Sequence, residues 1–266
     1  MAKLITSMLA TEGLFVYRGF LNVAERQGAL RAAIALSRQA QEEAARSAKA
    51  ESTSSAHNVN QAEKFKSVSV PLENGKTAVC EHFSQYGEGH RLTYFRGEIP
   101  SPGVPTLLDR LADLDPLQDE VASSRQRLQK NMDAAWKWKL TLNHYPPAGG
   151  ATVPRKGFPW HRDLIANGAA TMILNLGAPG GLEFGEEPPT ETPVDGMRYS
   201  TPQQQGQGQG QADHSVAPGD AIDALESLTL TDGDLLLLTG RARWEYLHRV
   251  VPTAGGERAT LVYGVW

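Results

Sequence analysis

The second half of this 266-residue chain is a series of short apolar runs separated by turn residues. From Trp136 onward the runs are WKWKLTLNHY, TMILNL, GLEFG, LTLTDGDLLLLTG, RWEYLHRVV and ERATLVYGVW. Regularly spaced strands with turn chemistry, and without helices between them, are typical of an antiparallel sandwich or barrel. This half of the sequence therefore predicts a β fold of the jelly-roll kind.

The first half carries helical patterns. Residues 21–50 are rich in Ala, Gln, Glu and Arg, and Asn22 is a suitable N-cap, so we expect one long amphipathic helix there. Two shorter helices are expected near residues 103–114 and 116–132, because their leucines recur at helical spacing. We expect these helices to pack outside the sheet.

Two stretches carry turn or loop signals. The pair Asn74 and Gly75 lies between alternating apolar residues, which predicts a hairpin near residues 65–80. The segment from Pro188 to Val216 includes QQQGQGQGQ and has no apolar periodicity. We expect it to be a disordered surface insert between two strands of the β region.

Composition narrows the setting of the protein. The formal net charge of −4 gives no overall basic field, so contact with a nucleic acid would depend on a local patch. Cys80 is the only cysteine, which excludes an internal disulfide and a Cys-rich zinc site and fits a reducing compartment. The sequence has no signal-peptide pattern and no apolar run near the roughly 18 residues of a membrane helix. We expect a monomer of the cytoplasm or nucleus, without a membrane partner.

The stretch FPWHRDLIANG places His161 and Asp163 two positions apart. Alternate residues of a strand point to the same face, so both side chains can project into one cavity. His248, on another expected strand, is a third candidate ligand. Two histidines and a carboxylate form the facial triad of non-haem iron(II) oxygenases, and zinc would also accept these ligands. The alternative is a loop histidine bonded to a neighbouring aspartate.

Arg258 lies ten residues beyond His248, on the next expected strand. Its planar guanidinium suits bidentate capture of a carboxylate. An iron oxygenase that uses 2-oxoglutarate needs such a group for the distal carboxylate of this cosubstrate. Without the triad, an exposed strand arginine would be the simpler interpretation.

The order of these motifs resembles that of the AlkB-like 2-oxoglutarate and iron(II) dependent dioxygenases. The block GDLLLLTGRARWEYLHRVVP followed by ERATLVYG carries the family's Gly-Asp, Gly-x-Ala-Arg, His and Arg elements. Upstream, LNHYPPAGGATVPRKGFPWHRD is similar to its Asn-x-Tyr, Gly and His-x-Asp run, and TMILNLGAPGGLEFG resembles its next two core strands. The resemblance covers roughly residues 136–266, apart from the insert. It implies a single α+β domain with a double-stranded β-helix (jelly-roll) core and N-terminal helices packed outside the sheet.

The resemblance also implies roles for individual residues. The ligands of Fe(II) would be His161, Asp163 and His248, and Arg258 would bind 2-oxoglutarate. Asn143 and Tyr145 would hydrogen-bond this cosubstrate from a neighbouring strand, and dioxygen would be the second cosubstrate. Without the family, Asn143 and Tyr145 would read as a strand-end polar residue and a half-buried aromatic, although their alternate spacing puts both on one face.

The substrate implied by the resemblance is a modified nucleobase in DNA or RNA, such as a methylated base, which would be demethylated or hydroxylated. Residues 1–135 would then supply helices and a substrate lid, and residues 136–266 the catalytic core. In the segment EHFSQYGEGHRLTYFRG, aromatic and basic side chains could stack a flipped base and touch phosphates. The candidate residues are Phe83, Tyr86, Arg91, Tyr94 and Arg96, together with Ile165 after the metal motif. Alternatively, these are edge strands whose aromatics pack on the sheet.

Two positions depart from the family pattern. Gly264 stands where the family often has a second arginine, six positions after the clamp, and Ile165 stands where many nucleobase-repairing members have an acid. Both departures leave the metal site intact and weaken the case for base repair. A protein, lipid or small-molecule substrate therefore stays open, as do a non-catalytic binding module on the same scaffold and a zinc hydrolase.

Overall fold

The protein is built mostly from antiparallel β-sheets, with few helices. The computed structural model describes residues 3–6, 9–54, 67–83, 90–131, 135–147, 157–163, 165–186, 222–251 and 256–266. The strands are β1 (Lys3–Thr6), β2 (Leu14–Arg18), β3 (Ser67–Pro71), β4 (Thr77–Phe83), β5 (Arg91–Gly97), β6 (Trp138–Tyr145), β7 (Phe158–His161), β8 (Ala170–Gly177), β9 (Gly180–Gly185), β10 (Glu226–Leu230), β11 (Leu235–Leu238), β12 (Leu247–Val251) and β13 (Arg258–Val265). The helices are α1 (Val23–Ser54), α2 (Leu107–Ala112), α3 (Asp115–Arg127) and α4 (Gly240–Trp244), with 3-10 turns η1 (Ala10–Glu12) and η2 (Ile165–Asn167).

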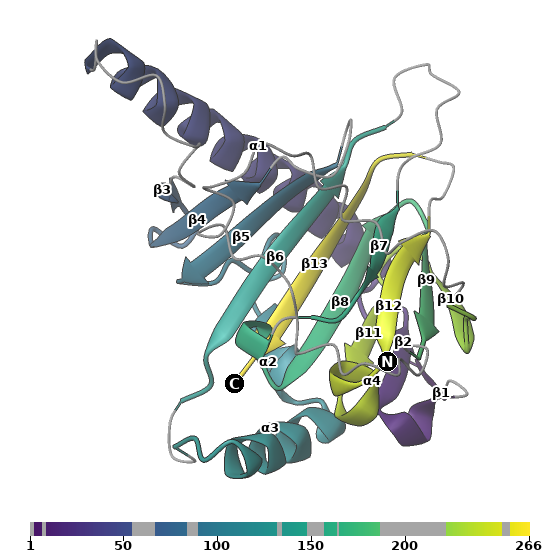
Figure 1. Ribbon diagram of the computed structural model, residues 1–266. Helices are drawn as coiled ribbons and strands as arrows, with labels where there is room; N and C mark the ends of the chain where they lie inside the picture. Colours follow the sequence, from purple (N-terminus) through teal and green to yellow (C-terminus); the bar gives the residue numbers. More distant parts are fainter. Residues whose placement is uncertain are drawn as a thin grey trace.

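The strands form two sheets that face each other. The larger sheet has nine strands in the order β1-β2-β11-β8-β13-β6-β5-β4-β3, and the smaller has four in the order β10-β9-β12-β7. In Figure 1 the smaller sheet lies in front of the β13, β8 and β11 side of the larger one. The prediction of an antiparallel sandwich is confirmed at this level.

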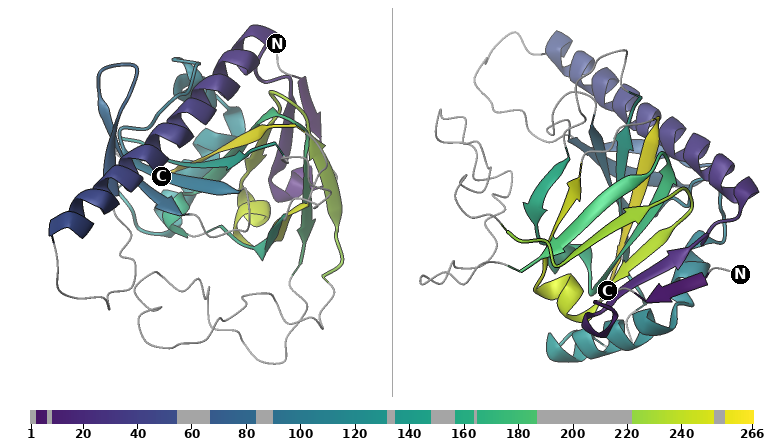
Figure 2. Two further views of the ribbon diagram at one scale, coloured as in Figure 1. Left: turned by 90° about the horizontal axis from the view of Figure 1, so that it is seen from above. Right: turned by 90° about the vertical axis from the view of Figure 1, so that its right-hand side faces the viewer.

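Alternating side chains divide the core into two layers. One apolar cluster includes Leu142, Leu174 and Leu261 of the large sheet together with Ala33 of α1. The second includes Ile173 and residues of the small sheet such as Phe184 of β9, so it lies between the two sheets. Successive strand residues point to opposite faces, which is why neighbouring β8 residues join different clusters. Helix α1 runs across the outer face of the large sheet (Figure 2).

Helix α1 begins as its sequence predicts. The side chain of Asn22 accepts a hydrogen bond from the backbone N–H of Glu25 at 3.0 Å, and the Glu25 carboxylate accepts one from the Asn22 N–H at 2.9 Å. This reciprocal capping box satisfies two backbone donors that the first turn leaves without partners. The hairpin between β3 and β4 is also confirmed, with Gly75 at a positive φ of 77° in its turn.

The N-terminal half differs from expectation. The hairpin strands β3 and β4 were expected, but β1 and β2 were not; both belong to the large sheet, and β2 pairs directly with β11 from the far end of the chain. A second difference is α4, a short helix between two strands in the region where no helices were expected. The Gln/Gly insert of residues 188–216 lies outside the described residues. None of the described helices is long and apolar enough to cross a membrane.

Candidate metal centre

Two histidines face each other across paired strands of the small sheet. His161 ends β7, and its cross-strand partner on β12 is His248. Their ring centroids lie 4.1 Å apart, and His248 is buried. The register shifts between His248 and Val250, which marks a bulge at the site. Bulges are frequent next to active sites because they redirect a side chain locally.

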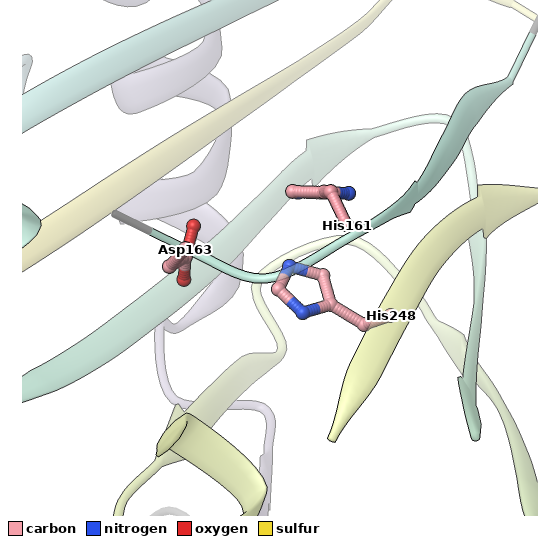
Figure 3. Close-up of side chains that lie close together, drawn as sticks. All are labelled: His161, Asp163 and His248. Atoms are coloured by element: carbon pink, nitrogen blue, oxygen red, sulfur yellow. The ribbon is translucent and has the colours of Figure 1, made fainter. Parts of the chain in front are cut away.

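Asp163 completes the cluster from a different kind of position. It was expected to share a strand with His161, but β7 ends at His161 and Asp163 lies in the chain that follows (Figure 3). The ligand atoms of His161, Asp163 and His248 nevertheless all lie within 4.8 Å of one another. The expected grouping of the three side chains is therefore present, although strand alternation is not what produces it.

The charges around the cluster suit a cation. Burial lowers the pKa of His248 to about 3, and His161 lowers it further while Asp163 opposes the shift. Burial alone would raise the pKa of Asp163, but the neighbouring His248 and Arg243 hold it below its ordinary value. Metal binding requires neutral imidazoles and an ionised carboxylate, so His248 and Asp163 are already in the required states at neutral pH.

One oxygen of Asp163 also favours a bound cation. The Oδ2 atom is buried and has no hydrogen-bond partner among the described residues. Leaving a buried carboxylate oxygen without a partner costs free energy, and a bound cation removes this cost. Two imidazole nitrogens and one carboxylate oxygen form a donor set that fits a divalent transition metal, and iron(II) and zinc are both acceptable.

A buried arginine lies in the neighbouring large sheet. Arg258 begins β13, pairs in register with Tyr145 of β6 and Gly177 of β8, and is 3% exposed. Its Nε donates to Oδ1 of Asn175 at 2.8 Å, and the Asn175 amide donates to the carbonyls of Ala178 and Thr231. The interpretation as an exposed strand arginine is therefore wrong.

A glycine makes room for this guanidinium. A Cβ at Gly180 would lie 2.1 Å from Cζ of Arg258, so every other residue at this position would displace the guanidinium. On β6, the ring of Tyr145 lies under the same group, with Cζ 4.9 Å from its centroid. Tyr145, which was expected to hydrogen-bond the cosubstrate, thus lies beside Arg258.

Asn143 lies two residues before Tyr145 on β6, so its side chain points to the same face of the sheet. It pairs with Thr260 of β13 and Leu92 of β5 and is 9% exposed. Its Oδ1 is 3.0 Å from Nε2 of His90. His90, which was not among the expected site residues, also stacks on Tyr145 with a centroid distance of 4.3 Å and an angle of 11°.

An aromatic row connects this group with the metal ligands. The ring of Phe158 lies edge-on to His90 at a centroid distance of 6.4 Å and edge-on to His161 at 4.4 Å. Phe158 and His161 are the two ends of the short strand β7. The row therefore connects the Arg258 group with the metal ligands through successive ring contacts.

Gly264 has no space for the second arginine of the AlkB-like pattern. A Cβ there would lie 1.6 Å from the carbonyl oxygen of Asn167 in η2. A different arginine contacts the metal-ligand segment. Arg243 of α4, which is buried, donates from Nη1 to the carbonyl of Asp163 at 3.1 Å and from Nη2 to that of Gly168 at 2.9 Å. The only sequence signal for this contact is Arg243 in the Gly-x-Ala-Arg element.

The proposed substrate residues separate into groups. Arg91 donates to Gln41 of α1, and its β6 partner is His144, so Arg91 lies on the outer face of the sheet, away from Asn143. Tyr94 and Arg96 point to the opposite face from Arg91, which is the face of Asn143. The Arg96 guanidinium lies 5.3 Å from the Tyr94 ring centroid.

For the remaining three substrate candidates, the structure gives fewer contacts. Ile165 begins η2 and is 49% exposed. Phe83 ends β4, but the structure does not describe its side chain. Tyr86 lies outside the described residues.

Comparisons with known proteins add little to this site. No family model matches the chain, and no curated protein matches it. Among solved structures, a vicilin from Corylus avellana (hazelnut) matches 68% of this chain with 10% sequence identity and a TM-score of 0.29. The match spans 31% of the vicilin chain.

Proposed function

We propose that this protein is an iron(II) and 2-oxoglutarate dependent dioxygenase of the AlkB-like type, built on a double-stranded β-helix. One observation carries the proposal: the ligand atoms of His161, Asp163 and His248 lie within 4.8 Å of one another, and a buried arginine lies on the facing sheet. A metal triad alone fits many reactions. A triad connected by ring contacts to the group of Arg258, Asn143 and Tyr145 fits a metal enzyme with a carboxylate cosubstrate.

The residues divide the work in this proposal. His161, Asp163 and His248 hold the metal on three positions and leave the remaining positions open. Bound iron(II) would supply the activation of dioxygen coupled to oxidation of 2-oxoglutarate to succinate and carbon dioxide. Arg258 binds the distal carboxylate of 2-oxoglutarate, and Asn143 and Tyr145 donate hydrogen bonds that orient it.

A methylated nucleobase in DNA or RNA is our first candidate substrate. It is supported by the family resemblance and by Tyr94 and Arg96, which offer a ring and a cation on the same sheet face as Asn143. Arg96 is shared with Glu81, to which it donates at 3.1 Å, so its charge is partly balanced. Hydroxylation of an N-methyl group would release it as formaldehyde.

A turnover assay tests the proposal. Purified protein with iron(II), 2-oxoglutarate and a methylated oligonucleotide should release formaldehyde and succinate in equal amounts. Succinate formation that no DNA or RNA stimulates would reject the nucleobase but retain the oxygenase. A crystal soaked with manganese and N-oxalylglycine, an unreactive mimic of 2-oxoglutarate, should show metal between the triad residues. Absence of metal there would reject the proposal itself.

A protein, lipid or small-molecule substrate is the second candidate. Ile165 favours it, because an exposed apolar side chain, 49% accessible, begins the 3-10 turn that follows the metal ligand Asp163. An apolar contact beside the site suits a less polar target than a nucleic acid. Stimulation of 2-oxoglutarate turnover across a panel of these substrate classes would separate the two candidates.

Two further functional hypotheses make predictions that differ from those of the dioxygenase. A zinc hydrolase would remain active without oxygen and 2-oxoglutarate, and a non-catalytic module would bind neither iron nor 2-oxoglutarate. Anaerobic binding measurements and an oxygen-free activity assay distinguish both from the dioxygenase.

A further inference from the structure

His90 is a buried histidine beside the Arg258 group. It immediately precedes β5 and is 6% exposed. A buried histidine in a sheet is most often a polar residue that simply finds one partner. His90 instead contacts two residues of the Arg258 group at once, by a hydrogen bond to Asn143 and by parallel stacking on Tyr145.

The hydrogen bond fixes the direction of an amide. Nε2 of His90 lies 3.0 Å from Oδ1 of Asn143. When this oxygen accepts from His90, the two N–H donors of the same amide are directed elsewhere. No described residue accepts a hydrogen bond from Nδ2 of Asn143, and the side chain is 9% exposed. A nearly buried amide with two unused donors is suited to an anionic ligand.

The surroundings of His90 keep it neutral. Burial lowers its pKa to about 4; the hydrogen bond to Asn143 opposes this shift, and the positive charge of Arg258 and the neighbouring His144 add to it. A neutral imidazole carries a single N–H. If that proton is on Nε2, the ring donates to the amide oxygen and adds no second cation beside Arg258.

We infer that His90 is a positioning residue for the acidic ligand of Arg258: its Nε2–H fixes the Asn143 amide so that Nδ2 donates to a carboxylate of that ligand. The inference rests on the proposed function, because the ligand it names is a 2-oxo dicarboxylic acid. The contacts that carry this role are the hydrogen bond to Asn143 and the stacking on Tyr145. Its effect passes through Asn143 and through the orientation of the Tyr145 ring.

Binding measurements on the full-length, manganese-loaded protein test this role. His90→Phe retains a ring on Tyr145 and removes the donor, so we expect 2-oxoglutarate to bind about 5- to 10-fold more weakly, as loss of one hydrogen bond predicts. His90→Gln retains an N–H donor and should restore binding to within about threefold of the original protein. Affinity for manganese should be the same in all three proteins. Anaerobic titration calorimetry measures both affinities.

His144 offers a matched control. It is also a buried histidine, it neighbours Asn143 on β6, and its Nε2 lies 3.1 Å from Glu257 on the outer face of the sheet. His144→Phe makes the same chemical change without touching the Asn143 amide. It should leave the affinity for 2-oxoglutarate within about twofold, so a loss equal to that of His90→Phe would overturn the inference.

A double-mutant cycle tests whether His90 acts through Asn143. His90→Phe should weaken binding in the original protein and have no further effect in an Asn143→Ala background. Equal effects in both backgrounds would overturn the inference. Labelling the histidine rings with ¹⁵N should identify the His90 Nε2–H tautomer, and an Nδ1–H tautomer would contradict it.

The outcomes separate the two proposals. If the manganese-loaded original protein does not bind 2-oxoglutarate, the proposed function fails, and the role of His90 toward this ligand fails with it. If the original protein binds 2-oxoglutarate and His90→Phe binds it equally well, only the inference about His90 fails.

Discussion

The two ends of the site are built in opposite ways. The metal end lies on a short strand pair with a bulge, draws Asp163 from outside the strand, and leaves the Asp163 Oδ2 buried without a partner among the described residues. The arginine end lies in the regular centre of the large sheet, where Asn175 fixes Arg258 and Gly180 leaves it space.

The two ends differ in how far protein contacts already hold the groups that would bind a ligand. The metal end has donors in protonation states that suit a divalent cation. The arginine end is already held by protein contacts before any ligand arrives, which reduces the entropy lost on binding. We therefore expect changes at the metal end to affect metal affinity, and changes at the arginine end to affect only the acidic ligand.

The largest effects on binding should come from substitutions that remove one key residue at each end of the site. His248→Ala removes one of three ligands and should weaken manganese binding by at least about 100-fold, because losses in the surrounding shell alone reach 10- to 100-fold. Arg258→Leu should leave manganese affinity within about threefold and abolish measurable binding of 2-oxoglutarate. Anaerobic titration of each variant measures both. Equal loss of manganese binding in the two variants would refute the separation.

A smaller effect is expected from acid. The folded-state pKa of His90 is lowered from 6.5 to about 4, so between these values the unfolded chain takes up a proton that the folded protein does not. Stability should therefore fall as the pH decreases from about 6.5 to 4, by at most about 3 kcal/mol from this group. In urea unfolding at several pH values, His90→Phe should show a shallower loss across this window. An identical pH dependence would show that His90 is not held neutral.

Gly180→Ala tests the position of the Arg258 guanidinium without removing its charge. The new methyl group would lie 2.1 Å from Cζ of Arg258 and displace the guanidinium, so we expect about 10-fold weaker binding of 2-oxoglutarate with manganese binding unchanged. Gly256→Ala is a matched control two residues before Arg258, since a Cβ there has no atom within 4 Å. Similar calorimetric affinities for both variants would show that the guanidinium position is unimportant.

The smallest effect concerns the support of Asp163. Arg243→Lys keeps the charge but replaces the fork that reaches the carbonyls of Asp163 and Gly168, so manganese binding should weaken about fivefold, the cost of roughly one hydrogen bond. Arg241→Lys is the control, because Arg241 is on the same helix and pairs with surface carboxylates such as Glu245. A metal titration in which both variants match the original protein would remove Arg243 from this role.

The sequence predicted the parts of the site that short-range patterns encode. The family resemblance predicted the grouping of His161, Asp163 and His248, and alternation put Asn143 and Tyr145 on one face. The same alternation rule failed for Asp163, because it does not state where a strand ends.

Other features depend on pairings between distant segments. His90 was passed over because nothing in its local sequence indicates that β5 lies beside β6, which is what brings His90 to Asn143. Arg91 was misassigned for a related reason: the face of a strand residue is known only when the register is known. The place of β2 beside β11 was likewise invisible to local patterns.

The mixed origin of the large sheet has a consequence for folding. Strands β6, β8, β11 and β13 come from the second half of the chain, but β6 is flanked by β5 and β11 by β2, both from the first half. A fragment limited to residues 136–266 would expose the edges of β6 and β11 as unpaired, partly apolar strands, which favours association between chains. The chain order of sheet pairing also makes most of the contacts long-range, and such topologies fold slowly. The first half of the chain therefore completes the large sheet on both sides of the strands that carry Arg258, Asn143 and Tyr145.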